Sequence, residues 1–322
     1  MSHQETQNIF NGCHALGPWK TPYDYVPWKA AGVVFVLFFG LSGVGHMVQF
    51  CWKRTWWCSV FTIGCLGEFI GWGARLTSAH CPYNSTAYLI QISTLIISPV
   101  FFTAGLYILL GRLIMVAGRE SSYLSPKAYL WIFCVADVIS LLMQAAGGGL
   151  ASIESSARKS TALGSNLMLA GIIFQMFSIT IFVICAIDFV RRTSRCHLID
   201  PHRKSLTPML CAMFFSLTCI YVRSIYRVVE LAQGWAGFLI THQIYFVILD
   251  GMMMALAVGV FNFVHPGWML SPKSDFEMPK EVSTVSLNTS SNVSYATNPA
   301  YAPTWNPAHQ NTKSQLTPVR YT

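Results

Sequence analysis

Seven long apolar stretches follow one another between positions 30 and 264, and short polar loops separate them. A helix of about 20 residues crosses the ~30 Å hydrocarbon core of a bilayer. Because lipid offers the backbone no hydrogen-bond partner, helices are expected for such runs. The pattern predicts an all-α polytopic membrane bundle of seven transmembrane helices. The expected spans are 30–50, 56–75, 88–116, 128–149, 162–190, 207–231 and 235–264.

Composition supports a single membrane domain. Hydrophobic residues make up 53% of the 322-residue chain and charged residues 11%, whereas soluble domains carry about 25% charged residues. Residues 1–29 are polar and show no signal peptide, so they are expected to form an extracytosolic segment. The bundle is expected at 30–267. Residues 268–322 are rich in Ser, Thr, Asn and Pro, which predicts a disordered tail.

The distribution of Lys and Arg predicts the orientation, since cytosolic loops carry the excess of these residues. The loops before span one and after span four contain only Lys20, Lys29, Arg158 and Lys159. The N-terminus is therefore expected outside and the C-terminus in the cytosol, and the net charge of +8 reflects topology rather than nucleic-acid binding. The loops after spans one, three and five carry Lys53, Arg54, Arg119, Lys127, Arg191, Arg192, Arg195, Arg203 and Lys204.

This orientation assigns chemistry to the outer loops. Asn84, in the sequence Asn84-Ser85-Thr86, becomes a candidate glycosylation site. Of ten cysteines, only Cys13 and Cys81 fall in extracytosolic segments. In an oxidising compartment such a pair is a candidate disulfide, and two unpaired thiols are the alternative.

Ionisable side chains inside the spans are costly in lipid, so each is a candidate functional residue. Asp137 and Gln144 share one face of span four, and Arg223, Arg227 and Glu230 share one face of span six. These faces are expected to turn inward and meet in a polar cavity in the outer half. Asp137 is expected to pair with Arg223, directly or through water, as the floor of this cavity. The alternative is a set of structural ion pairs that fix helix register. The candidate substrate-binding residues are Glu68, Asp137, Gln144, Arg223, Arg227, Glu230, His242 and Asp250.

Several chemistries lack their residues. The last span contains no Lys, so a retinal Schiff base has no attachment point. His242 and His265 are 23 residues apart, and no H-x-x-x-H spacing occurs, so no metal site is expected. No phosphate-binding loop of the Walker type is present. We therefore expect no cofactor and no enzymatic activity.

Short motifs in spans two to seven resemble those of the fungal lipid-translocating exporter family, named for resistance to aminocholesterol. One departure is Gln243, where that family often has a Glu in the last span. The matching motifs are Gly67-Glu68-x-x-Gly71, Ser98-Pro99, Leu110-Gly111-Arg112, Asp137-x-x-Ser140-x-x-x-Gln144-x-x-Gly147-Gly148-Gly149, Arg223-x-x-Tyr226-Arg227-x-x-Glu230, Gly234-x-x-Gly237, Leu249-Asp250 with Met254, and His265-Pro266-Gly267.

The resemblance implies a multi-pass protein that exports or flips amphipathic lipids or lipid-like toxicants. It is expected in the plasma membrane, with other endomembranes as the alternative. Sphingoid long-chain bases, sterol-like compounds and porphyrins are the substrate classes it implies. The expected partners are thus membrane lipids or amphipathic small molecules, and the oligomeric state stays open. The alternative is a seven-helix receptor or sensor that regulates lipid asymmetry indirectly. Against common receptors, Gly111-Arg112-Leu113 lacks an acidic-Arg-Tyr triplet and Phe261-Asn262-Phe263 lacks Asn-Pro-x-x-Tyr.

Overall fold

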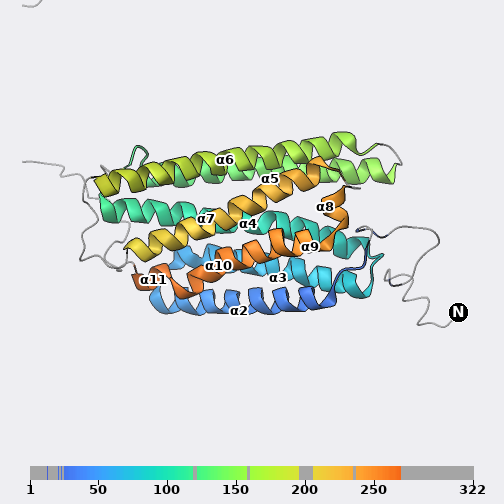
Figure 1. Cartoon of the computed structure of the whole chain (residues 1–322), viewed down its shortest axis with the longest axis horizontal. Coiled ribbons are helices and arrows are strands. Elements are labelled where there is room, and N and C mark those ends of the chain that lie inside the picture. The colour runs from blue at the N-terminus through green and yellow to red at the C-terminus, as the bar shows by residue number, and fades with distance from the viewer. Residues whose placement is uncertain are drawn as a thin grey trace, which may run out of the picture. The chain divides into compact units, whose positions relative to one another are not determined.

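A computed structural model describes residues 13, 21, 23, 25–118, 122–157, 160–195, 206–234 and 237–269. All regular structure in these ranges is helical (Figure 1). Apart from residues 268 and 269, the predicted tail lies outside the described residues, as does most of segment 1–29. The helices are α2 (Lys29–Lys53), the 3-10 turn η1 (Trp56–Cys58), α3 (Ser59–His80), α4 (Ser85–Ala117), α5 (Pro126–Ser156), α6 (Ala162–Arg195), α7 (Leu206–Ala232), α8 (Phe238–Thr241), α9 (Gln243–Tyr245), the π-helix η3 (Phe246–Met252), α10 (Met253–Phe263) and α11 (Pro266–Met269).

Within the described ranges, six helical segments are long and apolar enough to cross a membrane. They correspond to α2, α4, α5, α6, α7 and the continuous run Gln243–Met269. The second predicted span is not among them, because α3 carries Glu68, Arg75 and four glycines. It packs against both α2 and α4. Glu68 and Arg75 are buried in the bundle, whereas Ile63, Leu66, Phe69 and Ile70 of the same helix are exposed. Six candidate spans are thus found where seven were predicted.

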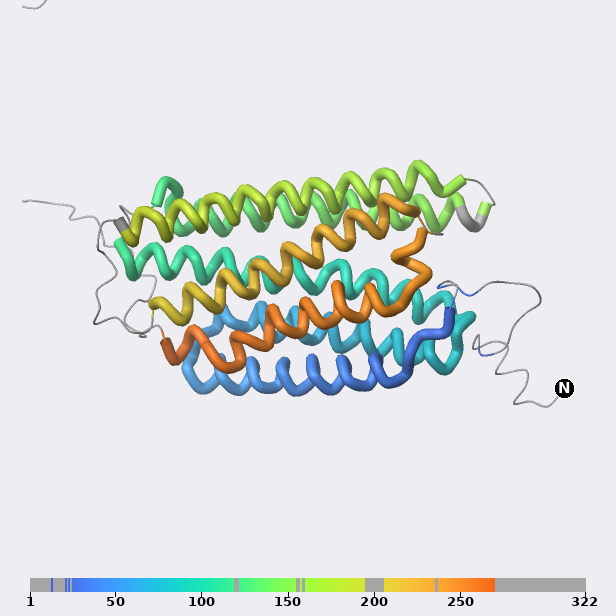
Figure 2. Tube along the Cα trace, viewed as in Figure 1, coloured from blue at the N-terminus to red at the C-terminus, as the bar shows by residue number. Residues whose placement is uncertain are grey.

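Glycines allow the helices of the bundle to approach closely, as expected of membrane helices. A side chain at Gly67 of α3 would overlap Ser98 of α4, and one at Gly71 would overlap Leu95. The same device joins α5 to α6, where Gly147 and Gly164 face each other's helix backbone. Figure 2 shows α5 and α6 running side by side. The glycine run 147–149 was expected to end a span, but α5 continues to Ser156.

The last membrane segment is interrupted at its start. His242 has extended backbone angles between α8 and α9, and seven residues of π-helix follow before α10 resumes regular α-helical bonding. π-Helical segments are rare and are frequently found at functional sites. Asp250 lies in this segment, buried against α7.

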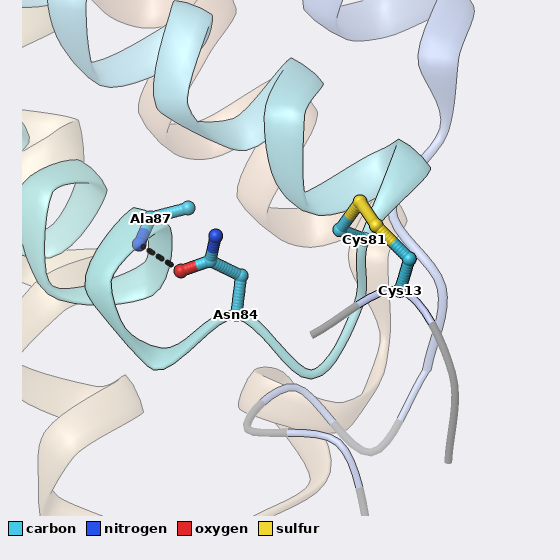
Figure 3. Close-up of a disulfide and its surroundings, with 4 residues drawn as sticks. All are labelled: Cys13, Cys81, Asn84 and Ala87. Carbon is cyan, nitrogen blue, oxygen red and sulfur yellow. Dashed lines mark hydrogen bonds between the residues drawn. A yellow bond between two sulfur atoms is a disulfide. The ribbon is translucent and has the colours of Figure 1, made fainter. Parts of the chain in front are cut away.

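The disulfide between Cys13 and Cys81 joins the N-terminal segment to the end of α3 (Figure 3). Asn84 lies close by and caps α4, because its Oδ1 accepts a hydrogen bond of 3.0 Å from the backbone N–H of Ala87. The cap leaves the side-chain nitrogen, the atom that would carry a glycan, outside this hydrogen bond.

Candidate functional site

A buried ion cluster joins α7 to the π-helix. Asp250 is 1% exposed, and its Oδ1 lies 2.8 Å from the Nε of both Arg223 and Arg227. The Nε–H of Arg227 donates a hydrogen bond to that oxygen. The Nε–H of Arg223 is not aligned with it, so that contact is an ion pair without a directed hydrogen bond. Arg223 instead donates from Nη2 to the carbonyl of Leu95 on α4, at 2.6 Å.

The cluster continues along α7. Arg227 donates from Nη1 to Oε2 of Glu230 at 3.0 Å, and the hydroxyl of Tyr226 donates to Oε1 at 2.7 Å. The three charged residues of α7 recur at i, i+4 and i+7, which brings them to one face of the helix. Two guanidinium groups and two carboxylates therefore balance each other inside the bundle.

The prediction of a direct pair between Asp137 and Arg223 is wrong. Asp137 faces α4, where its Oδ2 accepts hydrogen bonds of 3.0 Å from the hydroxyls of Thr103 and Tyr107. Arg223 pairs with Asp250 instead. The i, i+7 spacing correctly placed Arg223 on an inward face of its helix, but that spacing carries no information on which neighbouring helix the face meets.

Of three other candidate residues, two make local contacts and the third has no hydrogen-bond partner. Gln144 donates to Ser140 at 2.7 Å and to Gln175 of α6 at 3.2 Å, which ties α5 to α6. His242 is exposed, and its Nδ1 lies 2.8 Å from the carbonyl of Phe238. Glu68 is buried, and neither of its carboxylate oxygens has a hydrogen-bond partner.

A cavity with an empty volume of about 660 Å³, counted with its open side, lies next to the ion cluster. Of the eight candidate binding residues, only Arg227 and Glu230 line it. Its lining contains both polar and apolar side chains. The polar and aromatic lining consists of Tyr23, Tyr25, Arg75, Tyr88, Gln91, Arg227, Glu230 and Phe246, and the aliphatic lining of Ile92, Ile96, Met168, Ile172, Leu231 and Ile240.

Sequence reasoning missed the part of this wall that comes from the N-terminal segment. The hydroxyl of Tyr23 donates to Oε1 of Gln91 at 2.7 Å and lies 3.0 Å from Oγ of Ser78. Burial raises the pKa of Tyr23 above its usual value, so this hydroxyl stays protonated and able to donate. The backbone N–H of Trp28 donates to the side chain of Gln243 at 3.1 Å. No periodic signal marks residues 21–28, because they precede the first helix.

Arg75 of α3 completes the polar wall. Its side chain is buried beneath the N-terminal segment, and Nη2 donates to the hydroxyl of Tyr25 at 2.9 Å. Its guanidinium carbon lies 4.4 Å from the ring centre of Phe246 and 5.4 Å from that of Tyr23. Arg75 is the last residue of the predicted span 56–75. At such a position, a basic side chain is expected to reach the membrane–water interface.

Comparison with known proteins agrees with the motifs. The sphingoid long-chain base transporter of Saccharomyces cerevisiae is 30% identical over 283 residues, which cover 77% of this chain and 74% of that protein. The protoporphyrin uptake protein 1 of the same species is 33% identical over 277 residues, 74% of this chain and 90% of the relative. A third relative from this species, protein RTM1, is 34% identical over 200 residues, which cover 62% of this chain and 63% of that protein.

No solved structure gives a significant match to the chain. The RTA1-like protein family matches residues 61–273, which include α3 to α11 and therefore most of the cavity wall. Together with the relatives, this match shows that the chain belongs to the RTA1-like family of fungal membrane proteins.

Proposed function

We propose that this protein exports amphipathic lipids or lipid-like toxicants, or moves them between leaflets, at the plasma membrane. The substrates belong to the sphingoid long-chain base or sterol-like class, and transport gives resistance to them. The observation that carries this proposal is the cavity, lined by both polar and apolar side chains, within a bundle of helices of membrane-spanning length. An amphipathic molecule needs such a site, because its headgroup requires hydrogen-bond partners where its hydrocarbon requires none.

The cavity combines an apolar lining with a few polar groups, as sites for small molecules commonly do. Arg227 and Glu230 are charged residues of the lining, so we propose that they contact the headgroup. Asp250, which also pairs with Arg223, holds Arg227 in place.

The names of the relatives support the same class of activity. One is a transporter of sphingoid long-chain bases, and another is a protoporphyrin uptake protein. Both names refer to the movement of bulky, largely apolar molecules.

Flux measurements in vesicles test the proposal. Purified protein reconstituted alone should accelerate the movement of a fluorescent long-chain base across the bilayer, and Ile172→Trp, which fills the cavity from α6, should slow it. The matched control is Ile173→Trp, because Ile173 is its neighbour on α6 but is exposed on the outside of the bundle and does not line the cavity. Flux no faster than in protein-free vesicles would contradict transport and favour a sensor.

A further inference from the structure

We propose that Arg75 is an anion-binding residue of the cavity, so that the preferred occupant carries a carboxylate or a phosphate ester on its headgroup. This inference rests on the proposed function, in that the cavity is taken to hold the transported amphiphile. It narrows the proposed substrate class, because within that class it favours members with an acidic headgroup, such as phosphorylated long-chain bases, over free bases and sterols.

Arg75 is a buried cation without a counter-ion. Its residue is 1% exposed, and among the described residues no carboxylate lies within ion-pairing distance of it. The Nε–H has no hydrogen-bond partner, and Nη2 donates to the neutral hydroxyl of Tyr25. Aromatic rings attract a cation, but they do not neutralise it. A buried charge is costly unless it is paired. An anion bound in the cavity is therefore the simplest partner for the guanidinium of Arg75.

The other charged groups near the cavity are already committed. Asp250 is shared by Arg223 and Arg227, and Glu230 accepts from Arg227 and Tyr226. These four charges sum to zero, so Arg75 is the charge that remains on the lining. Arg223 and Arg227, both candidate binding residues from the sequence, are neutralised by acidic residues of the bundle.

Glu68 does not neutralise Arg75. It lies two helical turns earlier on α3 and is not part of the cavity lining. Neither of its carboxylate oxygens has a hydrogen-bond partner, so it makes no hydrogen bond to Arg75. A headgroup that carries only an ammonium group would therefore meet no free carboxylate in this cavity, and it would be repelled by Arg75. An acidic group would be attracted there.

The geometry of the guanidinium also fits an acidic group. Arginine presents its N–H groups in a planar fork that matches two oxygens of a carboxylate or phosphate. The rings of Tyr23 and Tyr25 lie 5.4 and 5.7 Å from its guanidinium carbon, and the Tyr25 hydroxyl accepts a hydrogen bond from Nη2. The rival explanation is that Arg75 only anchors residues 23–25 to α3, through Tyr25 and the ring contacts.

Equilibrium binding of radiolabelled single-chain lipids to the full-length protein in detergent distinguishes an anion-binding role of Arg75 from an anchoring role. The four probes share a long alkyl chain and differ in headgroup: hexadecanol is neutral, sphingosine is cationic, palmitate carries a carboxylate and phosphorylated sphingosine carries a phosphate. We expect wild-type protein to prefer palmitate or phosphorylated sphingosine over hexadecanol, and the stronger of the two identifies the acidic group.

The variant Arg75→Gln keeps a side-chain donor for Tyr25 but removes the charge. It should weaken binding of the acidic probes by about 10- to 100-fold, the loss typical of one charge-assisted hydrogen bond, and leave hexadecanol binding unchanged. Arg192→Gln is the matched control, because Arg192 is an arginine of α6 outside the cavity. Arg75→Lys should retain the preference for acids if Arg75→Gln does not fold.

Each remaining outcome is decisive. Equal affinity of wild-type protein for hexadecanol and the acidic probes, or an equal loss of all four probes in Arg75→Gln, would overturn the anion site and leave Arg75 as an anchor. Stronger binding of sphingosine than of either acid would overturn it too. Binding of none of the probes by folded wild-type protein would instead contradict the proposed function.

Discussion

At the scale of single residues, Asp250 is the central counter-charge of the bundle. One carboxylate oxygen lies 2.8 Å from two guanidinium groups on α7, and the residue is almost completely buried. In a buried ion pair, the desolvation of the charges can cancel their attraction, so the pair adds little to stability. Removing one partner is different, because it leaves the other charge buried without compensation.

Asp250→Asn should therefore destabilise the protein by about 3–5 kcal/mol, since two arginines lose their shared counter-charge. The matched control is Asp188→Asn, which breaks the pair between Asp188 and Arg192 on α6. Those side chains are 39% and 33% exposed, so the control should cost no more than about 1 kcal/mol. Thermal unfolding in detergent, followed by size-exclusion chromatography, measures the difference. Equal melting temperatures for the two variants would show that Asp250 is not a structural counter-charge.

The residue scale also shows what the sequence could and could not predict. The spacing of Arg223, Arg227 and Glu230 correctly predicted one shared inward face. The partner of that face could not be derived, because axial position and rotation of neighbouring helices are set by packing between side chains distant in sequence. Asp137 therefore received the wrong partner. Tyr23 and Tyr25 were missed for a related reason, since they lie in an irregular segment whose position depends on tertiary contacts.

At the scale of elements, the contact between α5 and α6 depends on glycine. A side-chain carbon added at Gly147 would lie 2.5 Å from the backbone nitrogen of Met168 and 2.7 Å from the carbonyl oxygen of Gly164. Backbone atoms cannot move aside as a flexible side chain does. The next residue, Gly148, has no atom within 4 Å of the same added carbon.

Gly147→Ala should therefore push the two helices apart and destabilise the protein by about 1–3 kcal/mol, the usual cost of overpacking. Gly148→Ala should be neutral or stabilise it by up to about 1 kcal/mol, because alanine restricts the unfolded chain more than glycine does. The two variants differ by one position and share the same chemistry, and their melting temperatures can be compared directly. If both variants melted together, the close approach of α5 and α6 would not limit stability.

For the whole molecule, the sequence predicted the helical class and the placement of most spans, because long apolar runs are a strong local signal. This signal is weaker for α3, because Glu68, Arg75 and four glycines lower its hydropathy. Both charged side chains are buried in the bundle, whereas Ile63, Leu66, Phe69 and Ile70 are exposed, so a hydropathy averaged over the helix understates its apolar outer face. The number of spans and the orientation of the chain therefore need a direct test.

We expect α3 to cross the membrane as a seventh span, with the N-terminus outside. The 22 residues of α3 span about 33 Å as a helix, which matches the thickness of the hydrocarbon core. The disulfide at Cys81 supports an extracytosolic position for the C-terminal end of α3, because disulfides persist in oxidising compartments outside the cytosol. Lys53 and Arg54, before α3, belong to the basic loops expected in the cytosol.

Epitope tags inserted singly into the full-length protein test this arrangement. A tag after Thr55, between α2 and α3, should bind antibody only after the cells are permeabilised, whereas a tag after Tyr83, between α3 and α4, should bind on intact cells. A tag at the N-terminus serves as the outer control, and each tagged protein must retain lipid binding. If the tags at Thr55 and Tyr83 were accessible from the same side, α3 would not cross the membrane. The six helical segments identified by length and hydropathy would then be the complete set of spans within the described residues, and the N-terminus and C-terminus would lie on one side.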